Sequence, residues 1–496
     1  MKMGIFADVP MPVPEIPIDR NTDVNKGIIE GLTGKSADII LHEFESSGIK
    51  MLGFMCDGMC DRLIVSESIL KPLKSYERRY EGDVLSDVKK FLVTETDMKE
   101  ISTVNSAIEG AMGGFFVLFI EGSETAIAFS VQGFSVRSVD EPGSEAQERG
   151  AREGFVENFK INMTMIRRRL RSADVRFKLK TVGVTGNNRV CICFIDGRVS
   201  EELLQDVEKR IENAVFDNVL ESGYLQPFLD TDRPSVFSGV GITERPDVMC
   251  AKLAEGKVGI IVDGTPFALY VPHIFVENLH SMDDYSNRPF YTTFIRMLKI
   301  ASFIISVALP GLYVGIAIFH QELFPEDLLY SIVSSELRTP FPIMLEAIII
   351  HLIFEIMREA GLRMPKTVGH AVSIVGALVI GDAAVTAGLI AAPMLIVVAL
   401  TAISSFVIPS LYNSVAVLRL TFILLGGTMG IYGIFLGLIV LAVNMTAIDP
   451  YGVPYTSPIA PVILPAMRDV VFRQGWKRMS KKLQVNKTLK KESLND

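Results

Sequence analysis

The sequence predicts an α/β N-terminal region of two lobes, followed by an all-α domain that crosses a membrane several times. The chain has 496 residues, of which 49% are hydrophobic and 21% charged, so it exceeds one ordinary domain and is too apolar to be disordered. Helix and strand patterns alternate before residue 289, which is typical of α/β lobes. Residues 367–448, by contrast, carry only two charged side chains, Asp382 and Arg419. About a quarter of the residues of a soluble domain are charged, so this stretch is not a water-facing surface.

Composition excludes further classes of protein. The formal net charge of −8 argues against a nucleic-acid binder, which usually carries a strong basic excess. The basic cluster at 167–180 lacks an aromatic stacking pattern, so a solvated face, a subunit contact or a contact with anionic membrane lipid explains it better. Five cysteines, an odd number, indicate free thiols in a reducing compartment. Cys56 and Cys60 could form half of a zinc site, but no second pair with matching spacing follows, so buried thiols are favoured and no metal is expected.

The N-terminal region divides into a leader and two lobes. Residues 1–35 begin with a proline-rich stretch and are predicted to be a loose leader. The break at 141–144 separates a first α/β lobe, residues 36–145, from a second, residues 146–288. The clearest local patterns are a β-hairpin over 114–131, a helix over 155–171, a strand over 190–195, a helix capped by Ser200 and a strand over 258–262.

Residues 289–470 are predicted to form the membrane domain. Nothing before the first long apolar run, near Phe294, resembles a signal peptide, so we expect the lobes to stay in the cytoplasm. About 20 apolar residues are needed to cross a bilayer. Four stretches meet this requirement, at 291–320, 367–390, 394–412 and 414–448.

The number of crossings follows from the charge of the tail. Residues 471–496 are basic, and the positive-inside rule therefore places them in the cytoplasm together with the N-terminus, which requires an even number of spans. We expect four full spans, with 340–362 as an amphipathic or re-entrant helix. Six spans would require both 340–362 and 455–467 to cross, and the latter is short and contains three prolines.

The segment 340–362 carries ionisable residues within an apolar background. His351, Glu355 and Arg358 fall on one helical stripe by i,i+4 and i,i+3 spacing, whereas Glu346 lies off that stripe and needs a separate partner or a headgroup boundary. Ionisable groups at membrane depth usually face a water path or a polar partner, which predicts a helix lining an aqueous vestibule. An amphipathic helix lying in the interface, with solvated charges, explains the pattern equally well.

The segment 367–390 is the candidate pore lining. Its small residues, among them Ser373, Gly376 and Ala377, let helix backbones approach closely, and helix packing alone is the simpler explanation for them. Asp382 shifts that balance, because a lone carboxylate in an apolar helix needs water, a cation or a partner such as Arg419. A ring of such helices would place carboxylates around an axis, the arrangement used for cation selectivity.

Signatures of catalysis are missing from the sequence. Gly34-Lys-Ser36 resembles the end of a phosphate-binding loop, but the required first glycine is replaced by Ile29. The histidines are scattered, and no nucleophile and base occur in a known spacing. We therefore expect no enzymatic activity, no catalytic residues and no cofactor.

A series of short segments, each weak alone, is specific as a group. They include Arg137-Ser-Val-Asp-Glu-Pro142, Glu221-Ser-Gly-Tyr-Leu225, Thr243-Glu-Arg-Pro246, Val262-Asp-Gly-Thr-Pro-Phe267, Pro340-Phe-Pro342, Arg358-Glu-Ala-Gly361 and Tyr451-Gly-Val-Pro-Tyr455. In this order, over about residues 36–465, the chain resembles the A subunits of GerA-type spore germinant receptors, a family that includes the stage V sporulation protein AF branch.

The resemblance implies a cytoplasmic α/β domain and a multi-pass domain in the inner membrane of a bacterial endospore, with both termini in the cytoplasm. It implies two partners, a transporter-like B subunit that carries the nutrient pocket and a lipoprotein C subunit. It also implies a homo-oligomer, a ring taken to be a pentamer, that forms a nutrient-gated ion channel.

The chain departs from the family pattern at His370, where Gln is usual, and at Asp382, where an uncharged residue is usual. Asp382 could alter the ion preference, or it could mark the AF branch, whose members act as accessory channels. The sequence therefore predicts the channel-type subunit of a spore germination receptor. The alternatives are an AF-type accessory channel and a membrane assembly scaffold without an ion path.

Overall fold

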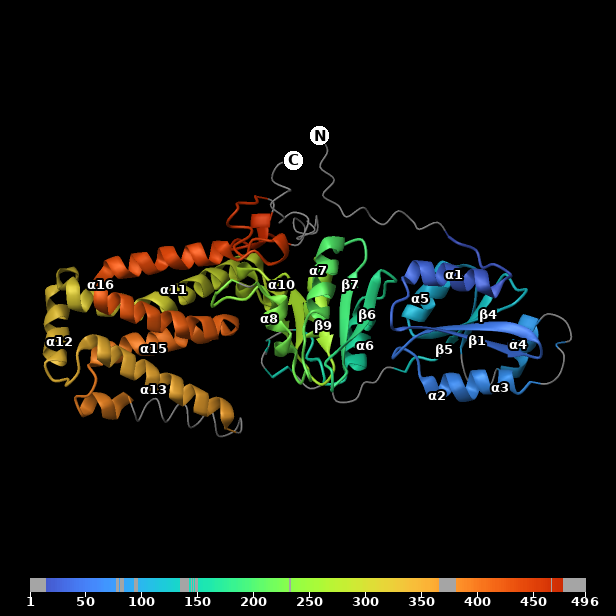
Figure 1. Ribbon diagram of the computed structural model, residues 1–496, viewed down its shortest axis with the longest axis horizontal. Helices are drawn as coiled ribbons and strands as arrows, with labels where there is room; N and C mark the ends of the chain where they lie inside the picture. Colours follow the sequence, from blue (N-terminus) through green and yellow to red (C-terminus); the bar gives the residue numbers. More distant parts are fainter. Residues whose placement is uncertain are drawn as a thin grey trace.

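The computed structural model describes residues 15–76, 80, 84–92, 97–133, 142, 143, 145, 147, 150–231, 233–364, 381–464 and 466–475. Two α/β lobes and a helical domain follow one another along the long axis of the molecule (Figure 1). After the last strand the regular elements of the described residues are all helical, which confirms the predicted fold class.

Lobe 1 is a five-stranded antiparallel sheet between two layers of helices. The strand order is β1-β2-β4-β5-β3. The strands are β1 (Ile39–Ser46), β2 (Ile49–Cys56), β3 (Met98–Ile101), β4 (Phe115–Ile120) and β5 (Ala126–Ser130). Helices α1 (Thr22–Thr33) and α5 (Val104–Met112) cover one face, and α2 (Arg62–Ile64), η1 (Val65–Leu70), α3 (Lys71–Lys74) and α4 (Val84–Leu92) cover the other (Figure 1).

The alternation of strand side chains explains why lobe 1 needs both layers. In β4, Val117 and Phe119 pack against α5, whereas Phe116 and Leu118 pack against the opposite helices. Both faces of this strand are apolar, so both must be covered. The predicted hairpin over 114–131 is confirmed as the β4–β5 pair.

The prediction of a loose leader over residues 1–35 is wrong for its second half. Residues 22–33 form α1, which begins after Asn21, whose side chain accepts a hydrogen bond from the backbone N–H of Asp23. Ile18 and Ile29 are buried in the core of lobe 1. The proline-rich stretch before residue 15 lies outside the described residues.

Lobe 2 repeats this architecture with the strand order β6-β7-β9-β10-β8. The strands are β6 (Val175–Val182), β7 (Asn188–Ile195), β8 (Gly241–Thr243), β9 (Val258–Val262) and β10 (Ala268–Val271). Helices α6 (Phe159–Arg169) and α9 (Pro246–Ala254) cover one face, and α7 (Glu201–Glu212), η2 (Ser222–Tyr224) and α8 (Gln226–Leu229) lie on the other side. The predicted cap is confirmed, because the Ser200 hydroxyl accepts a hydrogen bond from the N–H of Leu203.

A buried ion pair joins the two lobes. The Arg167 guanidinium, on α6 of lobe 2, donates to Asp38 of lobe 1 through Nε at 2.7 Å and Nη2 at 3.1 Å. It also donates to the carbonyl oxygens of Ser172 and Val175. The Cys56 thiol donates to the same carboxylate at 3.2 Å. All five cysteines are buried and free, as predicted.

The helical domain is built mainly from α11, α13, α15 and α16. Elements η3 (Phe275–Leu279) and α10 (Met282–Ser286) end lobe 2 and lead into the helical domain. Its own elements are α11 (Pro289–Phe319), η4 (Gln321–Leu323), α12 (Glu326–Glu336), α13 (Ile343–Arg363), α15 (Ala392–Phe406), η5 (Pro409–Leu411), α16 (Tyr412–Ala447), η6 (Pro450–Gly452) and η7 (Ala466–Asp469). Among the described residues, two helices are long and apolar enough to cross a membrane: 289–319, and 409–447 counted as one continuous helix. The apolar α15 is shorter.

Helix α16 is a hairpin, so the prediction of one continuous span over 414–448 is wrong. Gly430, at its middle, has φ 63° and ψ −148°, a conformation open only to glycine. The chain reverses there, since a Cβ on Gly437 would contact the ring of Phe422, fifteen residues earlier. Each half is about 26 Å long at 1.5 Å per residue, close to the hydrocarbon thickness of a bilayer.

Contacts with lobe 2 confirm the reversal. Ser414, at the start of α16, donates to the carbonyl oxygen of Val236 at 2.5 Å, and Ser235 donates to Asn444, at the end of α16, at 2.7 Å. We call this side of the helical domain the near end. The opposite side, where Gly430 contacts Phe319 of α11, is the far end.

Helices α13 and α15 both run from the far end to the near end. The first turn of α13 packs Met344 against Gly427, beside the α16 turn, whereas Glu355 reaches Tyr412 at the near end. Residues 365–380, between α13 and α15, lie outside the described residues. Among the described elements, α11, α13, α15 and the two halves of α16 make five passes along one axis (Figure 1).

Candidate functional site

Four side chains form a charged group inside the near end of the helical domain. We call Glu355, Arg358, Tyr412 and Arg419 the inner polar cluster. The Tyr412 hydroxyl contacts both oxygens of Glu355, at 2.9 and 3.0 Å, and Arg358 Nε donates to the same carboxylate at 3.1 Å. Arg419 Nη1 donates to Glu355 at 3.4 Å. One carboxylate thus serves two guanidinium groups, and it joins α13 to α16.

Arg419 explains why this cluster exists. Its side chain is only 2% exposed, and its Nε donates to the carbonyl oxygen of Ser306 on α11 at 3.2 Å. A buried guanidinium requires a counter-charge, which Glu355 supplies. The Arg358 guanidinium also lies over the Tyr412 ring, 4.0 Å from its centroid, a favourable cation–π contact.

His351 lies one turn before Glu355 and is buried rather than solvated. Its Nδ1 donates to the carbonyl oxygen of Ala347 at 2.8 Å, so Nε2 is left as an acceptor. Among the residues that the structure describes, neither this Nε2 nor the buried Nη2 of Arg419 has a hydrogen-bond partner. The structure therefore brings the predicted stripe of His351, Glu355 and Arg358 together with Arg419, which lies 64 residues beyond Glu355 along the chain.

Glu346 lies apart from this group, as its position off the stripe predicts. Its side chain is fully buried at the far end, in the first turn of α13. One carboxylate oxygen accepts a hydrogen bond from the backbone N–H of Ala391 at 2.6 Å. This bond holds the start of α15 against α13.

Asp382 does not pair with Arg419. It lies on a short helical segment at residues 381–386, its side chain is exposed, and within the described ranges it forms no ion pair. Three other predicted pore residues, Ser373, Gly376 and Ala377, lie outside the described residues.

A second charged group, missed by the sequence analysis, joins lobe 2 to the helical domain. Arg296, near the start of α11 and fully buried, donates to Asp284 at 2.8 Å and to Asp469 at 2.8 Å. It also donates to the carbonyl oxygen of Val470 at 3.1 Å. We call Asp284, Arg296 and Asp469 the junction cluster. No spacing rule relates these positions, because 173 residues separate Arg296 from Asp469.

A buried carboxylate in lobe 2 adjoins this junction. Glu277 pairs with Lys252 at 2.9 Å, and it also pairs with Lys257 and with His273. Burial alone would raise the pKa of Glu277, but Lys252 and Lys257 outweigh burial and hold the pKa well below its usual range. Glu277 is therefore ionised at neutral pH, next to the junction cluster.

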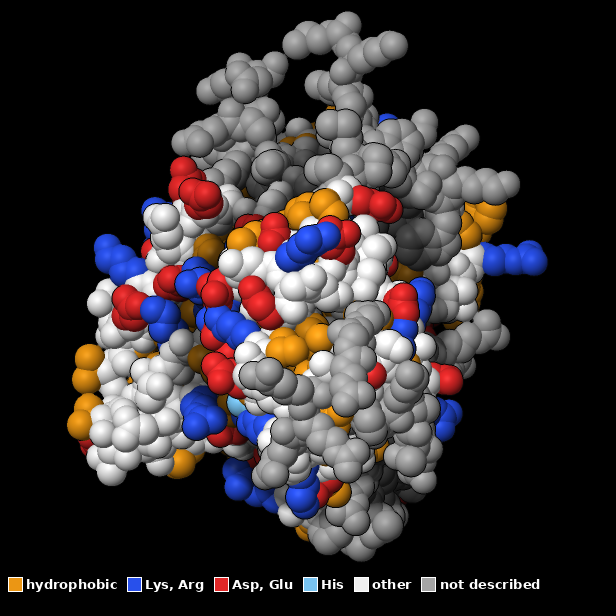
Figure 2. All heavy atoms as spheres, turned by 90° about the vertical axis from the view of Figure 1, so that its right-hand side faces the viewer, with side chains coloured by type: hydrophobic (Ala, Val, Ile, Leu, Met, Phe, Trp, Pro, Cys, Tyr) orange, Lys and Arg blue, Asp and Glu red, His pale blue; other side chains and the backbone are white. Residues whose placement is uncertain are grey.

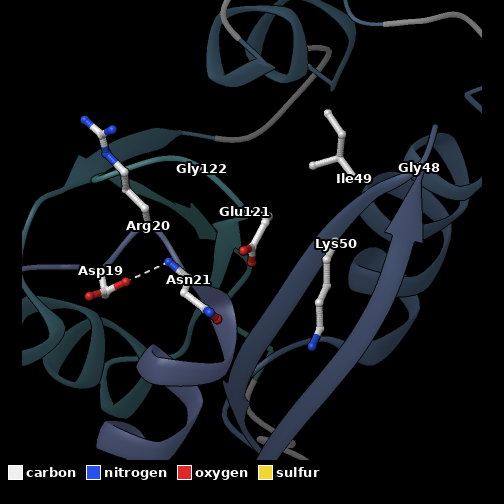
Figure 3. Close-up of a pocket in the computed structure, with 8 residues that line it drawn as sticks. All are labelled: Asp19, Arg20, Asn21, Gly48, Ile49, Lys50, Glu121 and Gly122. Atoms are coloured by element: carbon white, nitrogen blue, oxygen red, sulfur yellow. Dashed lines mark hydrogen bonds between the residues drawn. The ribbon is translucent and has the colours of Figure 1, made fainter.

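A surface hollow lies on lobe 1 (Figure 3). It has a volume of about 540 Å³ and is lined by Asp19, Arg20, Asn21, Gly48, Ile49, Lys50, Glu121 and Gly122. Its two cations are already paired, Lys50 with Asp23 and Glu43, and Arg20 with Glu124. Its carboxylates accept hydrogen bonds from neighbouring residues, Asp19 from Asn21 and Glu121 from Thr22. A hollow with internally satisfied charges offers little to recognise a ligand.

The surface charges also argue against a nucleic-acid site. Acidic and basic side chains are interspersed over the lobe 1 end of the molecule (Figure 2). In the basic cluster at 167–180, six of the seven cations pair with a carboxylate; these are Arg167, Arg168, Arg169, Arg176, Lys178 and Lys180. Among the described residues, no group of three or more His, Cys, Asp or Glu side chains is placed to hold a metal ion.

Comparison with known proteins links this architecture to spore germination. A family model described as "Bacillus/Clostridium GerA spore germination protein" matches residues 27–485. Spore germination protein KA of Bacillus subtilis is 36% identical over 448 residues, which cover 89% of this chain and 82% of the relative. The uncharacterized membrane protein YfkQ of the same organism is 34% identical, over 94% of this chain and 91% of its own length.

A solved structure also matches the N-terminal half. It is the crystal structure of the N-terminal domain of the A subunit of the Bacillus megaterium spore germinant receptor GerK3. The match covers 53% of this chain and 98% of that domain, with 23% identity and a TM-score of 0.42.

Replacing Glu355 with alanine is expected to destabilise the protein by about 3 kcal/mol, because Arg419 then remains buried without its carboxylate. Chemical unfolding of the detergent-solubilised chain would measure this. Glu359→Ala is the matched control, one turn further along α13: its partner Arg363 is 79% exposed, so a loss below about 1 kcal/mol is expected. Equal losses in the two variants would contradict the role given to the inner polar cluster.

The junction is expected to weaken in acid because of His280. Burial and the neighbouring Arg296 hold the pKa of His280 well below 6.5. Below about pH 6.5 the unfolded chain therefore binds a proton at His280 that the folded chain does not bind. As the pH decreases, the free energy of unfolding falls by up to about 1.4 kcal/mol per pH unit.

His280→Gln should flatten this decline in thermal unfolding between pH 7.5 and 5.5. His320→Gln, at the partly exposed His320 of the far end, should leave the decline intact. An unchanged pH profile in His280→Gln would remove His280 from the explanation.

Proposed function

This chain belongs to the GerA family of spore germination proteins, and from that premise we propose that it is a channel-forming A subunit of a germination receptor. In this proposal, several copies form a ring around an ion path, with a pentamer as the expected size. A nutrient bound by a partner subunit favours the open state of the ring. A ligand can shift such an equilibrium only if it favours one state over the other.

Asp382 is the observation that carries the proposal. A single chain exposes this carboxylate, which is the only charged residue between positions 367 and 418. Within the described residues no cation pairs with it. A charged side chain facing lipid is unfavourable by several kcal/mol. A water-filled path between copies removes that penalty, and a ring of such carboxylates favours cations over anions.

We infer six membrane crossings, in place of the four expected from the sequence. The hairpin of α16 counts as two, and α13 crosses as a full helix of 21 residues. The proline-rich stretch at 455–467 does not cross, since Tyr455 packs against Phe237 of lobe 2 and Phe275 at the near end. An even number keeps both termini on the cytoplasmic side of the spore inner membrane, as the basic tail favours.

The partners follow from family membership. The relatives are named spore germination proteins, and the N-terminal match is named as the A subunit of a germinant receptor. We propose a transporter-like B subunit and a lipoprotein C subunit as partners. The alternative is an AF-type accessory channel. It has the same ion path, but its opening does not depend on a nutrient bound by a partner subunit.

Replacing Asp382 with asparagine is expected to lower the cation-over-anion preference several-fold while leaving assembly intact, because a carboxylate ring attracts cations. Tracer flux in liposomes containing the chain, with and without co-expressed partner subunits, would measure the preference. Asp327→Asn, which removes an exposed carboxylate from α12, is the control and should leave selectivity unchanged.

Normal flux and selectivity in Asp382→Asn would place this residue outside the path. A well-assembled protein that conducts in neither preparation would favour a scaffold over a channel.

A further inference from the structure

Two carboxyl groups meet at the far end of the helical domain. Glu336 is the last residue of α12, and Glu346 lies in the first turn of α13. The two side chains are close enough to interact directly. Neither belongs to the inner polar cluster, which lies at the near end.

The pair is left without the partners that buried carboxylates require. Within the described parts of the chain, no lysine, arginine or histidine forms an ion pair with Glu336 or Glu346. The buried carboxylates Asp38 and Asp284 each pair with an arginine. The largely buried Glu277 and the partly buried Glu355 each contact at least two cationic groups. Two like charges brought together in an apolar interior must be neutralised.

Three buried oxygens point to a ligand as the neutralising group. Within the described parts of the chain, no N–H or O–H group of another residue donates to Oε2 of Glu346 or Oε1 of Glu336, and the hydroxyl of Tyr313 has no hydrogen-bond partner. Glu346 is 0% exposed and Tyr313 is 7% exposed. Tyr313, on α11, lies within electrostatic range of both carboxylates. The three oxygens belong to α11, α12 and α13, which meet at the far end.

An adjoining cavity gives access to this place. It has a volume of about 290 Å³ and lies between the end of α11, α12 and the start of α13. Glu336 and Gln321 are among its lining residues, and Phe324, also in its wall, packs on the Tyr313 ring with centroids 6.3 Å apart. The cavity is large enough for an ion with several water molecules.

The atoms available for coordination indicate which kind of ion binds. All three orphaned atoms are oxygens, which suit hard cations rather than zinc or copper. Two carboxylates balance a divalent charge. Calcium accepts irregular oxygen coordination completed by water, whereas magnesium demands near-ideal octahedral geometry.

We propose that Glu336, Glu346 and Tyr313 form a calcium-binding site that ties α12 to α13 and α11 at the far end. Water completes the coordination, since the protein supplies only three side chains, and the affinity falls in the range of about 0.1–1 mM typical of extracellular calcium modules. The other oxygen of Glu346 holds the start of α15 through Ala391. Calcium therefore stabilises the far ends of four helices. The site does not depend on the proposed ion path.

The test uses the full-length chain, stripped with EDTA in detergent, and calcium alone as the probe. Radioactive calcium should bind at about one ion per chain, and the midpoint of thermal unfolding should rise with calcium concentration at constant ionic strength. Magnesium should raise it less, and sodium or potassium not at all.

Glu346→Gln keeps an acceptor for the Ala391 N–H and should abolish binding. Glu336→Gln and Tyr313→Phe provide second and third variants if Glu346→Gln does not fold. Glu326→Gln, an exposed carboxylate at the start of α12, should bind calcium as the parent does.

Absence of calcium binding by the parent would overturn the site. Binding that survives all folded variants would do the same. The midpoint of thermal unfolding could instead rise as the pH falls and show no response to calcium. This result would show that a shared proton neutralises the pair, and it too would overturn the proposal.

Discussion

The close approach of α11 to both halves of α16 sets the geometry of the helical domain. A Cβ on Gly426 would overlap with the carbonyl oxygen of Gly311, and a Cβ on Gly311 would overlap with that of Phe422. Helices at this separation gain dispersion contacts along their full length, which is how helices associate where apolar burial gives no advantage. Because Gly430 then reverses the chain, both ends of α16 return to lobe 2. The packing of the first half of α16 on α11 places Arg419 beside Ser306, within reach of Glu355.

Electrostatics in a low-dielectric interior accounts for the placement of charge. Each buried arginine that joins two parts of the molecule has an acidic partner: Arg167 between the lobes, Arg296 at the junction and Arg419 among the helices. Such pairs add little net stability, but breaking one leaves an uncompensated charge. They therefore fix the relative positions of the parts and provide a rigid route from lobe 2 to the helical domain. The pair of Glu336 and Glu346 is the exception that points to a bound cation.

Local patterns in the sequence predict local structure well. The β4–β5 hairpin, the Ser200 cap and the stripe of His351, Glu355 and Arg358 all follow from the spacing of neighbouring residues. The α16 hairpin does not, because a turn inside an apolar stretch lacks the polar residues that mark a loop in water. Its only signal is Gly430, one of several glycines in the segment. The junction cluster could not be predicted from the sequence for another reason, since Asp469 meets Arg296 only after the whole membrane domain has folded. Helix α1 was hidden by the proline-rich stretch before it.

The inferred membrane topology depends on the hairpin of α16. Cysteine accessibility tests this hairpin most directly. The five native cysteines are buried, so single cysteines at the exposed positions Asn413, Thr428 and Thr446 can be labelled selectively in sealed membranes with an impermeant maleimide. The hairpin predicts labelling of Thr428→Cys from outside, and labelling of Asn413→Cys and Thr446→Cys only after permeabilisation. Labelling of Asn413→Cys and Thr446→Cys from opposite sides of the membrane would show a single continuous span and contradict the account.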